Sequence, residues 1–331
     1  MAAELSVELS DLRGWGHQVR RAGGHCTMLS TYVATNVPDG DFGRILSLIQ
    51  GDYESMATTV REALSTDGHR LDLAGDSLHA TMRHFADADA DVAQSFGLGA
   101  RITDDGSAAA AFSDGGGTTA AAPTSGGETL PEVSFGWLFD KACELISWVG
   151  GPDLRSWVTE QIAGDVDKAS TQASAWANAA TAMRAVEADL DRGERAIERT
   201  WTGDAATAAQ AYLDQWLASL RQQASSLDQI GSYLHDMVQQ AVEMAQVVVD
   251  IVKEIISIIS AGWSMASIPI YGQIKLVDKV KDAIKLVNDA RKVITVFWNA
   301  LKLVVDGIKL TVTVFTSESL PAAPALPGAV A

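Results

Sequence analysis

Residues 186–217 read VEADLDRGERAIERTWTGDAATAAQAYLDQWL, and this stretch decides the fold. On both sides of its centre, apolar residues recur mainly at steps of three and four, which places them along one face of an α-helix. Between the two arms, Gly203 suits a left-handed helix end and Asp204 suits the N-cap of the next helix. The sequence therefore predicts a helical hairpin over roughly 155–250 that bends at Trp201 to Asp204. The two stripes consist of Ile162, Val166, Ala169, Ala173, Trp176, Ala180, Met183, Val186, Leu190, Ile197 and Trp201, and of Leu213, Leu217, Leu220, Ala224, Leu227, Gly231, Leu234, Val238, Ala241, Ala245 and Val248.

A second helical hairpin is expected over residues 1–97. Its first arm carries an apolar stripe from Leu12 to Val33 and ends at the breaker sequence NVPDGD, residues 36–41. Its second arm resumes a stripe at Ile49, and the sequence STDGH at 65–69 predicts a kink or short loop within that arm. The pattern therefore predicts an antiparallel hairpin whose second arm is interrupted.

Composition divides the rest of the chain. Residues 98–132 are rich in Gly, Ala, Ser and Thr and predict a flexible linker, and 316–331 predict a disordered Pro/Ala tail. Residues 133–250 hold a short leading helix and the central hairpin, and 251–315 hold an apolar turn followed by a basic amphipathic helix. The predicted fold is all-α, with antiparallel helical hairpins packed as an elongated four-helix-type bundle and a C-terminal helical extension.

Charge and composition narrow the function. The 331 residues include 25 Lys and Arg against 42 Asp and Glu, a formal charge of −17 that argues against nucleic-acid binding. The 47% hydrophobic content excludes a wholly disordered chain. No motif of a nucleotide-binding, hydrolase or zinc-peptidase site is present, so we expect no catalytic residues, no cofactor and no metal site. The acidic residues Glu187, Asp189, Asp191, Glu194 and Glu198 are interpreted as a solvated helix face.

The C-terminal region differs from the remainder in charge. From Lys275 to Lys309, eight basic residues oppose four acidic ones, and a candidate face is formed by Lys275, Lys279, Lys281, Lys285, Arg291 and Lys292. Together with the apolar stretch 255–274, this face suggests contact with an anionic membrane or with an acidic partner. Packing of the basic helix against the acidic hairpins is the favoured alternative. The stretch 255–274 itself is a poor transmembrane helix because it contains Ser, Gly, Gln and Pro269.

The bend Trp201-Thr202-Gly203 between two long striped helices resembles the WxG turn of the helical-hairpin proteins of ESX, or type VII, secretion systems of actinobacteria. Residues 1–97 are similar to secretion-associated proteins of the same systems, which carry the export element Tyr-x-x-x-Asp/Glu. The nearest match here is Phe85 to Asp89, with Phe in place of Tyr. Four residues apart on a helix, Phe85 and Asp89 share one face. The resemblance makes Trp201, Gly203, Phe85 and Asp89 the candidate site residues.

The resemblance also implies a function and its partners. In the family, two hairpins form a four-helix dimer in which the WxG turn of one lies near the export element of the other, and a secretion ATPase recognises the pair. Both features occur in this one chain, so we hypothesise a fused pseudo-dimer. The implied protein is a non-enzymatic secretion substrate or secretion-associated protein that forms coiled-coil contacts with the secretion ATPase, with another WxG protein or with further copies of itself.

The expected location is cytoplasmic before export and then secreted or at the cell surface. No cleavable signal peptide is expected, since Glu4, Glu8 and Asp11 interrupt the N-terminal segment. The alternatives are a membrane-active or pore-forming effector that uses 255–274, the helical delivery module of a toxin system, and a cytoplasmic scaffold.

Overall fold

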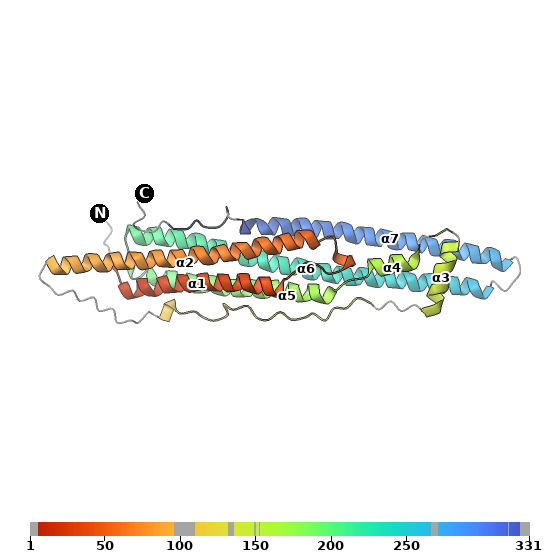
Figure 1. Ribbon diagram of the computed structural model, residues 1–331, viewed down its shortest axis with the longest axis horizontal. Helices are drawn as coiled ribbons and strands as arrows, with labels where there is room; N and C mark the ends of the chain where they lie inside the picture. Colours follow the sequence, from red (N-terminus) through yellow and green to blue (C-terminus); the bar gives the residue numbers. More distant parts are fainter. Residues whose placement is uncertain are drawn as a thin grey trace.

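The computed structural model describes residues 6–95, 110–131, 136–148, 150–151, 153–265, 271–316 and 318–324. These residues form an elongated bundle of long helices, so the predicted all-α class is confirmed (Figure 1). The helices are α1 (Leu9–Asn36), α2 (Gln50–Ser95), α3 (Gly136–Trp148), α4 (Leu154–Gln161), α5 (Val166–Ile197), α6 (Asp204–Met265) and α7 (Tyr271–Thr311). Two short strands, β1 (Ser6–Val7) and β2 (Trp201–Thr202), and the 3-10 turns η1 (Arg44–Leu46), η2 (Ala110–Phe112) and η3 (Val312–Phe315) complete the described elements.

The hairpins α1–α2 and α5–α6 pack along each other as an antiparallel four-helix section (Figure 1). Buried polar contacts join the two hairpins. The Tyr53 hydroxyl on α2 donates to Gln172 Oε1 on α5 at 2.7 Å, and the Trp176 indole N–H donates to the Tyr53 oxygen at 2.9 Å. All three side chains lie in the core. The two halves of the chain therefore share one hydrophobic core, which the stripes of their helices form together.

The predicted interruption of the second arm is wrong, because α2 runs unbroken through residues 65–69. Gly68 lies where α2 packs tightly on α1, and a Cβ atom there would come within 2.2 Å of Thr27 Oγ1. Gly23 occupies the matching place on α1, where a Cβ atom would lie 2.6 Å from the Gly68 carbonyl oxygen. The glycine that resembles a helix breaker in sequence thus permits tight packing of two helices.

The expected flexible linker is ordered over its described part, residues 110–131, which lies along α1 and α5. Phe112 is buried in the core. The backbone N–H of Gly115 donates to Asp189 at 3.0 Å, and the Tyr32 hydroxyl donates to the Ala121 carbonyl at 2.8 Å. Composition alone suggested flexibility, but polar side chains of the neighbouring helices bind the backbone of this segment. Residues 98–109 lie outside the described residues.

Beyond the four-helix section, α6 and α7 form a longer hairpin that extends to the far end of the molecule (Figure 1). The expected domain boundary at 250 falls inside α6, which continues to Met265. The buried side of α7 includes Val280, Val287 and Leu301, whereas residues 266–270 of the predicted apolar turn lie outside the described residues. Among the described helices, none combines the length and the apolar character needed to cross a membrane.

The described part of the predicted disordered tail is also packed against the bundle. Leu320 is buried, and the guanidinium of Arg70 on α2 donates to the carbonyl oxygens of Leu320 and Pro321. The expectation of disorder is therefore wrong for residues 318–324, because a cation on a neighbouring helix binds their backbone. Residues 325–331 are outside the described residues.

Candidate functional site

A two-residue strand pairing holds the bend between α5 and α6. Val7 pairs with Trp201 and Ser6 with Thr202 in antiparallel register. The backbone N–H of Glu8 extends the pairing by donating to the Thr200 carbonyl at 3.0 Å. The start of the chain thus fastens the bend to the first hairpin. The sequence does not predict this pairing, because a strand of two residues is too short to show an alternating pattern.

Gly203 makes the sharp reversal after Trp201. Its φ of 108° lies in a region that L-residues with a side chain rarely adopt, and its carbonyl accepts from the Thr207 N–H at 3.0 Å to begin α6. The reversal directs Trp201 into the molecule, where only 2% of this residue is exposed. The predicted positive φ of Gly203 agrees with this geometry, whereas Asp204, predicted as the N-cap, is the first residue of α6 and Gly203 takes the cap position.

The Trp201 ring contacts both arms of the first hairpin. Its centroid lies 6.1 Å from that of Trp15 on α1 and 6.4 Å from that of Phe85 on α2, and both pairs are edge-to-face. This geometry is favourable for aromatic side chains. The indole N–H groups of Trp15 and Trp201 have no acceptor among the described residues, so these contacts are apolar. The structure therefore brings Phe85 of the candidate export element against the tryptophan of the WxG turn.

Asp89, the other residue of the candidate export element, lies one helical turn beyond Phe85 and is exposed. Here α2 projects past the ends of α1 and α5 (Figure 1). The end of the bundle thus presents a half-buried aromatic ring beside an accessible carboxylate. We call the group Trp15, Phe85, Asp89 and Trp201 the composite site.

The interpretation of the acidic group on α5 as a solvated face is wrong for two of its members. Asp189 is buried and accepts from the N–H of Gly115. Glu194 is also buried, and burial raises its pKa to about 7, with the nearby carboxylates of Asp214, Glu198 and Asp191 raising it further. Of the other three, Glu198 is exposed, whereas Glu187 and Asp191 are half-buried and both pair with Arg221 of α6.

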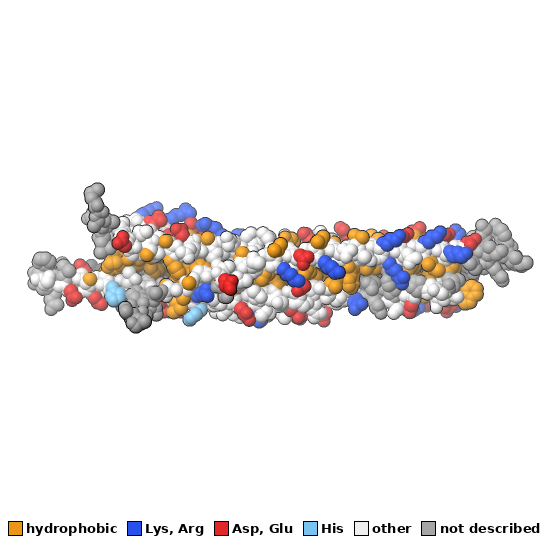
Figure 2. Space-filling view, turned by 90° about the horizontal axis from the view of Figure 1, so that it is seen from above, with side chains coloured by type: hydrophobic (Ala, Val, Ile, Leu, Met, Phe, Trp, Pro, Cys, Tyr) orange, Lys and Arg blue, Asp and Glu red, His pale blue; other side chains and the backbone are white. Residues whose placement is uncertain are grey.

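Most described residues of the predicted basic face of α7 are exposed, but Lys279 is half-buried, and three of the lysines pair with acids of their own helix. Each of Lys281, Lys285 and Lys292 forms an ion pair with the aspartate three residues before it on α7. Lys309 pairs with Asp52 of α2 at 3.0 Å and so joins the extension to the first hairpin. On the face in Figure 2, basic side chains gather over the α7 half of the molecule, with apolar side chains visible between them. The Lys275 side chain lies outside the described residues, and the other residues of the predicted face are Lys279 and Arg291.

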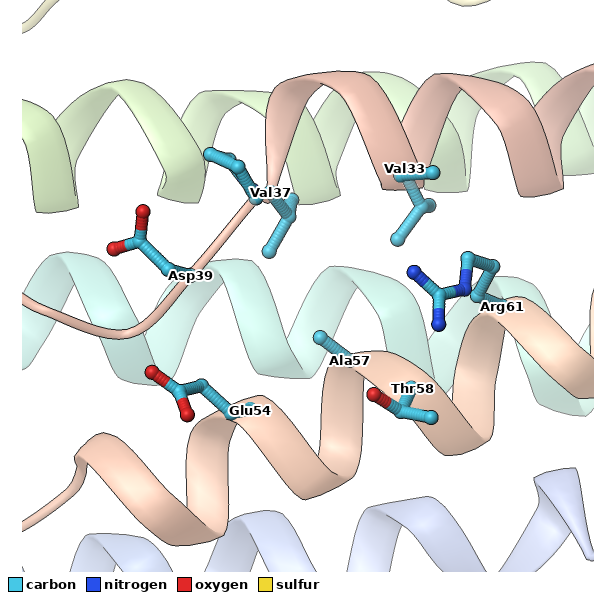
Figure 3. A pocket seen from close by; sticks show the side chains of 9 residues that line it. Val33, Val37, Asp39, Glu54, Ala57, Thr58 and Arg61 are labelled. Carbon is cyan, nitrogen blue, oxygen red and sulfur yellow. The ribbon is translucent and has the colours of Figure 1, made fainter.

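A cavity of about 300 Å³ opens beside the loop between α1 and α2 (Figure 3). Asp39 and Glu54 lie toward one end and Arg61 toward the other. Both carboxylates already have structural partners, because Asp39 pairs with Lys168 and Glu54 accepts from the Gly40 N–H at 3.1 Å. These contacts hold the loop between α1 and α2 against α5 and α2. Across the described residues, no cluster of three or more His, Cys, Asp or Glu side chains could hold a metal ion.

Comparison with known proteins identifies the central part of the chain. Residues 152–284 match the family model of the WXG100-like domain. The match spans α4, α5, the Trp201 bend, α6 and the beginning of α7, which is less than half of the chain. It confirms the recognition of a WxG-type helical domain of type VII secretion. No curated protein and no solved structure matches the chain.

Proposed function

We propose that this protein, whose residues 152–284 form a WXG100-like domain, is a type VII secretion substrate or secretion-associated protein that acts by helix–helix binding to other proteins. The observation that carries the proposal is the contact of Phe85 with Trp201, at 6.4 Å between ring centroids. This contact joins the candidate export element to the WxG turn within one chain. The proposed location is cytoplasmic before export and outside the cell afterwards.

The composite site supports recognition of this protein as a single unit. A two-protein complex completes such a surface only after the proteins associate, whereas here the α1–α2 and α5–α6 hairpins are covalently linked. The exposed carboxylate of Asp89 is available to a basic side chain, and the half-buried Phe85 ring offers apolar area next to it. A secretion ATPase or another WxG protein with a basic and apolar surface is the proposed partner.

The decisive experiment measures how much protein reaches the culture medium of a host with a type VII system. We expect Asp89→Asn to lower export about tenfold, the effect of losing about 1.4 kcal/mol of binding free energy. Asp91→Asn is the matched control, because Asp91 is exposed on the same helix end but points to a different face. Wild-type export of Asp89→Asn would contradict the proposed role of this carboxylate.

The WxG turn is tested by Trp201→Ala and Gly203→Trp. The first removes the ring that contacts Phe85, and the second places a bulky side chain at a φ of 108°. We expect both to reduce export while circular dichroism shows that most helicity remains. Unchanged secretion of both variants would show that export does not require the WxG turn.

The fused arrangement of the two halves has its own test. Residues 1–100 and 150–315, expressed separately and mixed, are expected to form a complex because each hairpin leaves an apolar stripe that the other covers. Analytical ultracentrifugation measures the complex. Two fragments that fold and remain separate would show that the hairpins are not a pseudo-dimer.

Membrane contact by α7 is a second candidate function, and it rests on a specific feature of that helix. Val296, Leu303 and Leu310 are 68–74% exposed and lie seven residues apart, so they share one face. Arg291 and Lys302 lie on the same part of α7, and no acidic group of the described residues pairs with either. Co-sedimentation with vesicles containing phosphatidylserine tests this function. Binding that Leu303→Ser weakens would support it, and absence of binding would exclude it.

A further inference from the structure

A groove lies between α2 and α6, directly beside the composite site. Its cavity measures about 320 Å³. The walls consist largely of small side chains, and Leu78, Tyr212 and Trp201 are the bulkiest residues that line it. Thr81, which also lines the cavity, precedes Phe85 on α2 by one helical turn. The groove therefore leads along the bundle to the ring pair Phe85 and Trp201.

The described tail, residues 318–324, enters this groove. Arg70 Nη1 on α2 donates to the carbonyl oxygens of Leu320 at 3.1 Å and Pro321 at 2.8 Å. From the opposite wall, the Tyr212 hydroxyl on α6 donates to the Ala322 carbonyl at 2.9 Å. Leu320 is buried, and Pro324 lines the cavity next to Trp201. Both walls thus bind consecutive carbonyl groups of the tail, at residues 320–322.

The chemistry of these contacts defines the segment that the groove accepts. All three hydrogen bonds go from side chains of the groove to backbone carbonyl oxygens of the tail. Proline has no backbone N–H, so a groove that binds only carbonyl groups accepts proline without leaving a donor unpaired. The sequence of residues 316–324 is TSESLPAAP, in which one large apolar side chain is followed by small residues and prolines. Small groove walls leave room for such a backbone.

We infer that the groove between α2 and α6 is a docking site for extended, proline-containing peptide segments, and that residues 318–324 occupy it in this chain. The tail thereby covers the Trp201 side of the composite site. A partner segment that enters the groove must displace the tail, which competes as a tethered ligand at high effective concentration. Peptide docking in the groove does not depend on the proposed function. Only one consequence rests on it, namely that displacing the tail exposes the composite site for recognition.

The test uses a fluorescein-labelled synthetic peptide, TSESLPAAP, and fluorescence polarisation. Two proteins with a vacated groove are compared with the wild type: the full chain carrying Leu320→Asp, and the chain without residues 316–331. We expect both to bind the peptide at least ten times more tightly than the wild type, whose own tail already accepts the hydrogen bonds of Arg70 and Tyr212. Adding Arg70→Leu to the Leu320→Asp chain is expected to weaken peptide binding at least tenfold, because it removes the donor to two carbonyl groups.

A control peptide carrying the same Leu320→Asp change is expected not to bind. Equal peptide binding by the wild type and both vacated proteins, or binding by neither vacated protein, would overturn the inference. The proposed function fails separately, through wild-type secretion of Asp89→Asn. If the vacated proteins do not bind the peptide but Asp89→Asn still lowers export, the docking inference is wrong and the proposed function stands.

Discussion

The two ends of this molecule bury their apolar stripes to different degrees. In the four-helix section, each of α1, α2, α5 and α6 has neighbours on both sides, and Trp176 is fully buried. At the far end, α6 and α7 have each other and the short α3, and Trp148 on α3 is 77% exposed. The difference teaches that similar helical stripes produce a closed core or an open surface according to the number of helices that cover them. External contacts of the far end are therefore expected to be apolar.

The largest expected effect on stability comes from replacing one tryptophan by alanine at each end of the molecule. Trp176→Ala removes a buried ring and the indole N–H that donates to the Tyr53 hydroxyl oxygen. We therefore expect it to lower the free energy of unfolding by about 3–5 kcal/mol. Trp148→Ala should change it by less than about 0.5 kcal/mol. Urea denaturation measures both values. A comparable loss for Trp148→Ala would mean that the far end is covered in solution.

A pair of adjacent glycines tests the tight packing of the first hairpin. Gly23→Ala is expected to lower the free energy of unfolding by about 1–3 kcal/mol, because the new methyl group meets backbone atoms of α2. Gly24→Ala, its neighbour in the same helix, meets nothing within 4 Å and is expected to raise it by about 0.5–1 kcal/mol. Thermal unfolding of the two variants checks the opposite signs. Equal effects would show that α1 and α2 lie farther apart.

The buried Asp67 on α2 is expected to make the stability of the four-helix section depend on pH. It is fully buried, and burial raises its pKa to about 7 from 3.8, although the nearby Gln223 side chain lowers it somewhat. Between these pH values the folded state holds more protons than the unfolded state, so the contribution to stability falls as the pH rises from about 4 to about 7.

Asp67→Asn removes this titration. The variant is expected to be more stable than the wild type by about 1–3 kcal/mol at pH 8 and nearly equal to it at pH 4. Its new amide can donate to Gln223 Oε1, which lacks a donor among the described residues. Urea titrations at both pH values measure the difference. A variant whose stability parallels that of the wild type across this range would show that Asp67 is solvated.

The smallest expected effect concerns the ion pair that joins the two ends. Lys309 and Asp52 are both about half exposed, so their coupling in a double-mutant cycle with Lys309→Gln and Asp52→Asn should be about 0.2–1 kcal/mol and should fall with added salt. Urea unfolding of the four proteins gives the coupling. A larger value that salt does not reduce would indicate that α7 is held on α2 mainly by charge.

Several features were predictable from local sequence, and others were not. The stripes around Trp176, the bend at Gly203 and both hairpins follow from spacing along the chain. The sequence around Gly68 predicts a break that the structure lacks, because a glycine that ends a helix and one that admits a neighbouring helix look alike in sequence. The composition of segments 110–131 and 318–324 predicts disorder that the structure does not show, because their order comes from contacts with other helices, such as the donor Arg70.

The candidate site divides in the same way. Trp201, Gly203, Phe85 and Asp89 were identified from motifs, and their expected proximity came from the resemblance to type VII secretion proteins. Only the tertiary structure places the ring of Phe85 against Trp201 and the tail in the adjacent groove.

The sequence by itself determined which residues form helices and which face of each helix is apolar, because these properties depend on neighbours three and four positions apart. The tertiary structure decided which faces are closed, which segments are ordered and which site residues meet. Those outcomes depend on contacts between residues distant in sequence, such as Arg70 with Pro321, whose donors and acceptors leave no periodic pattern in the chain.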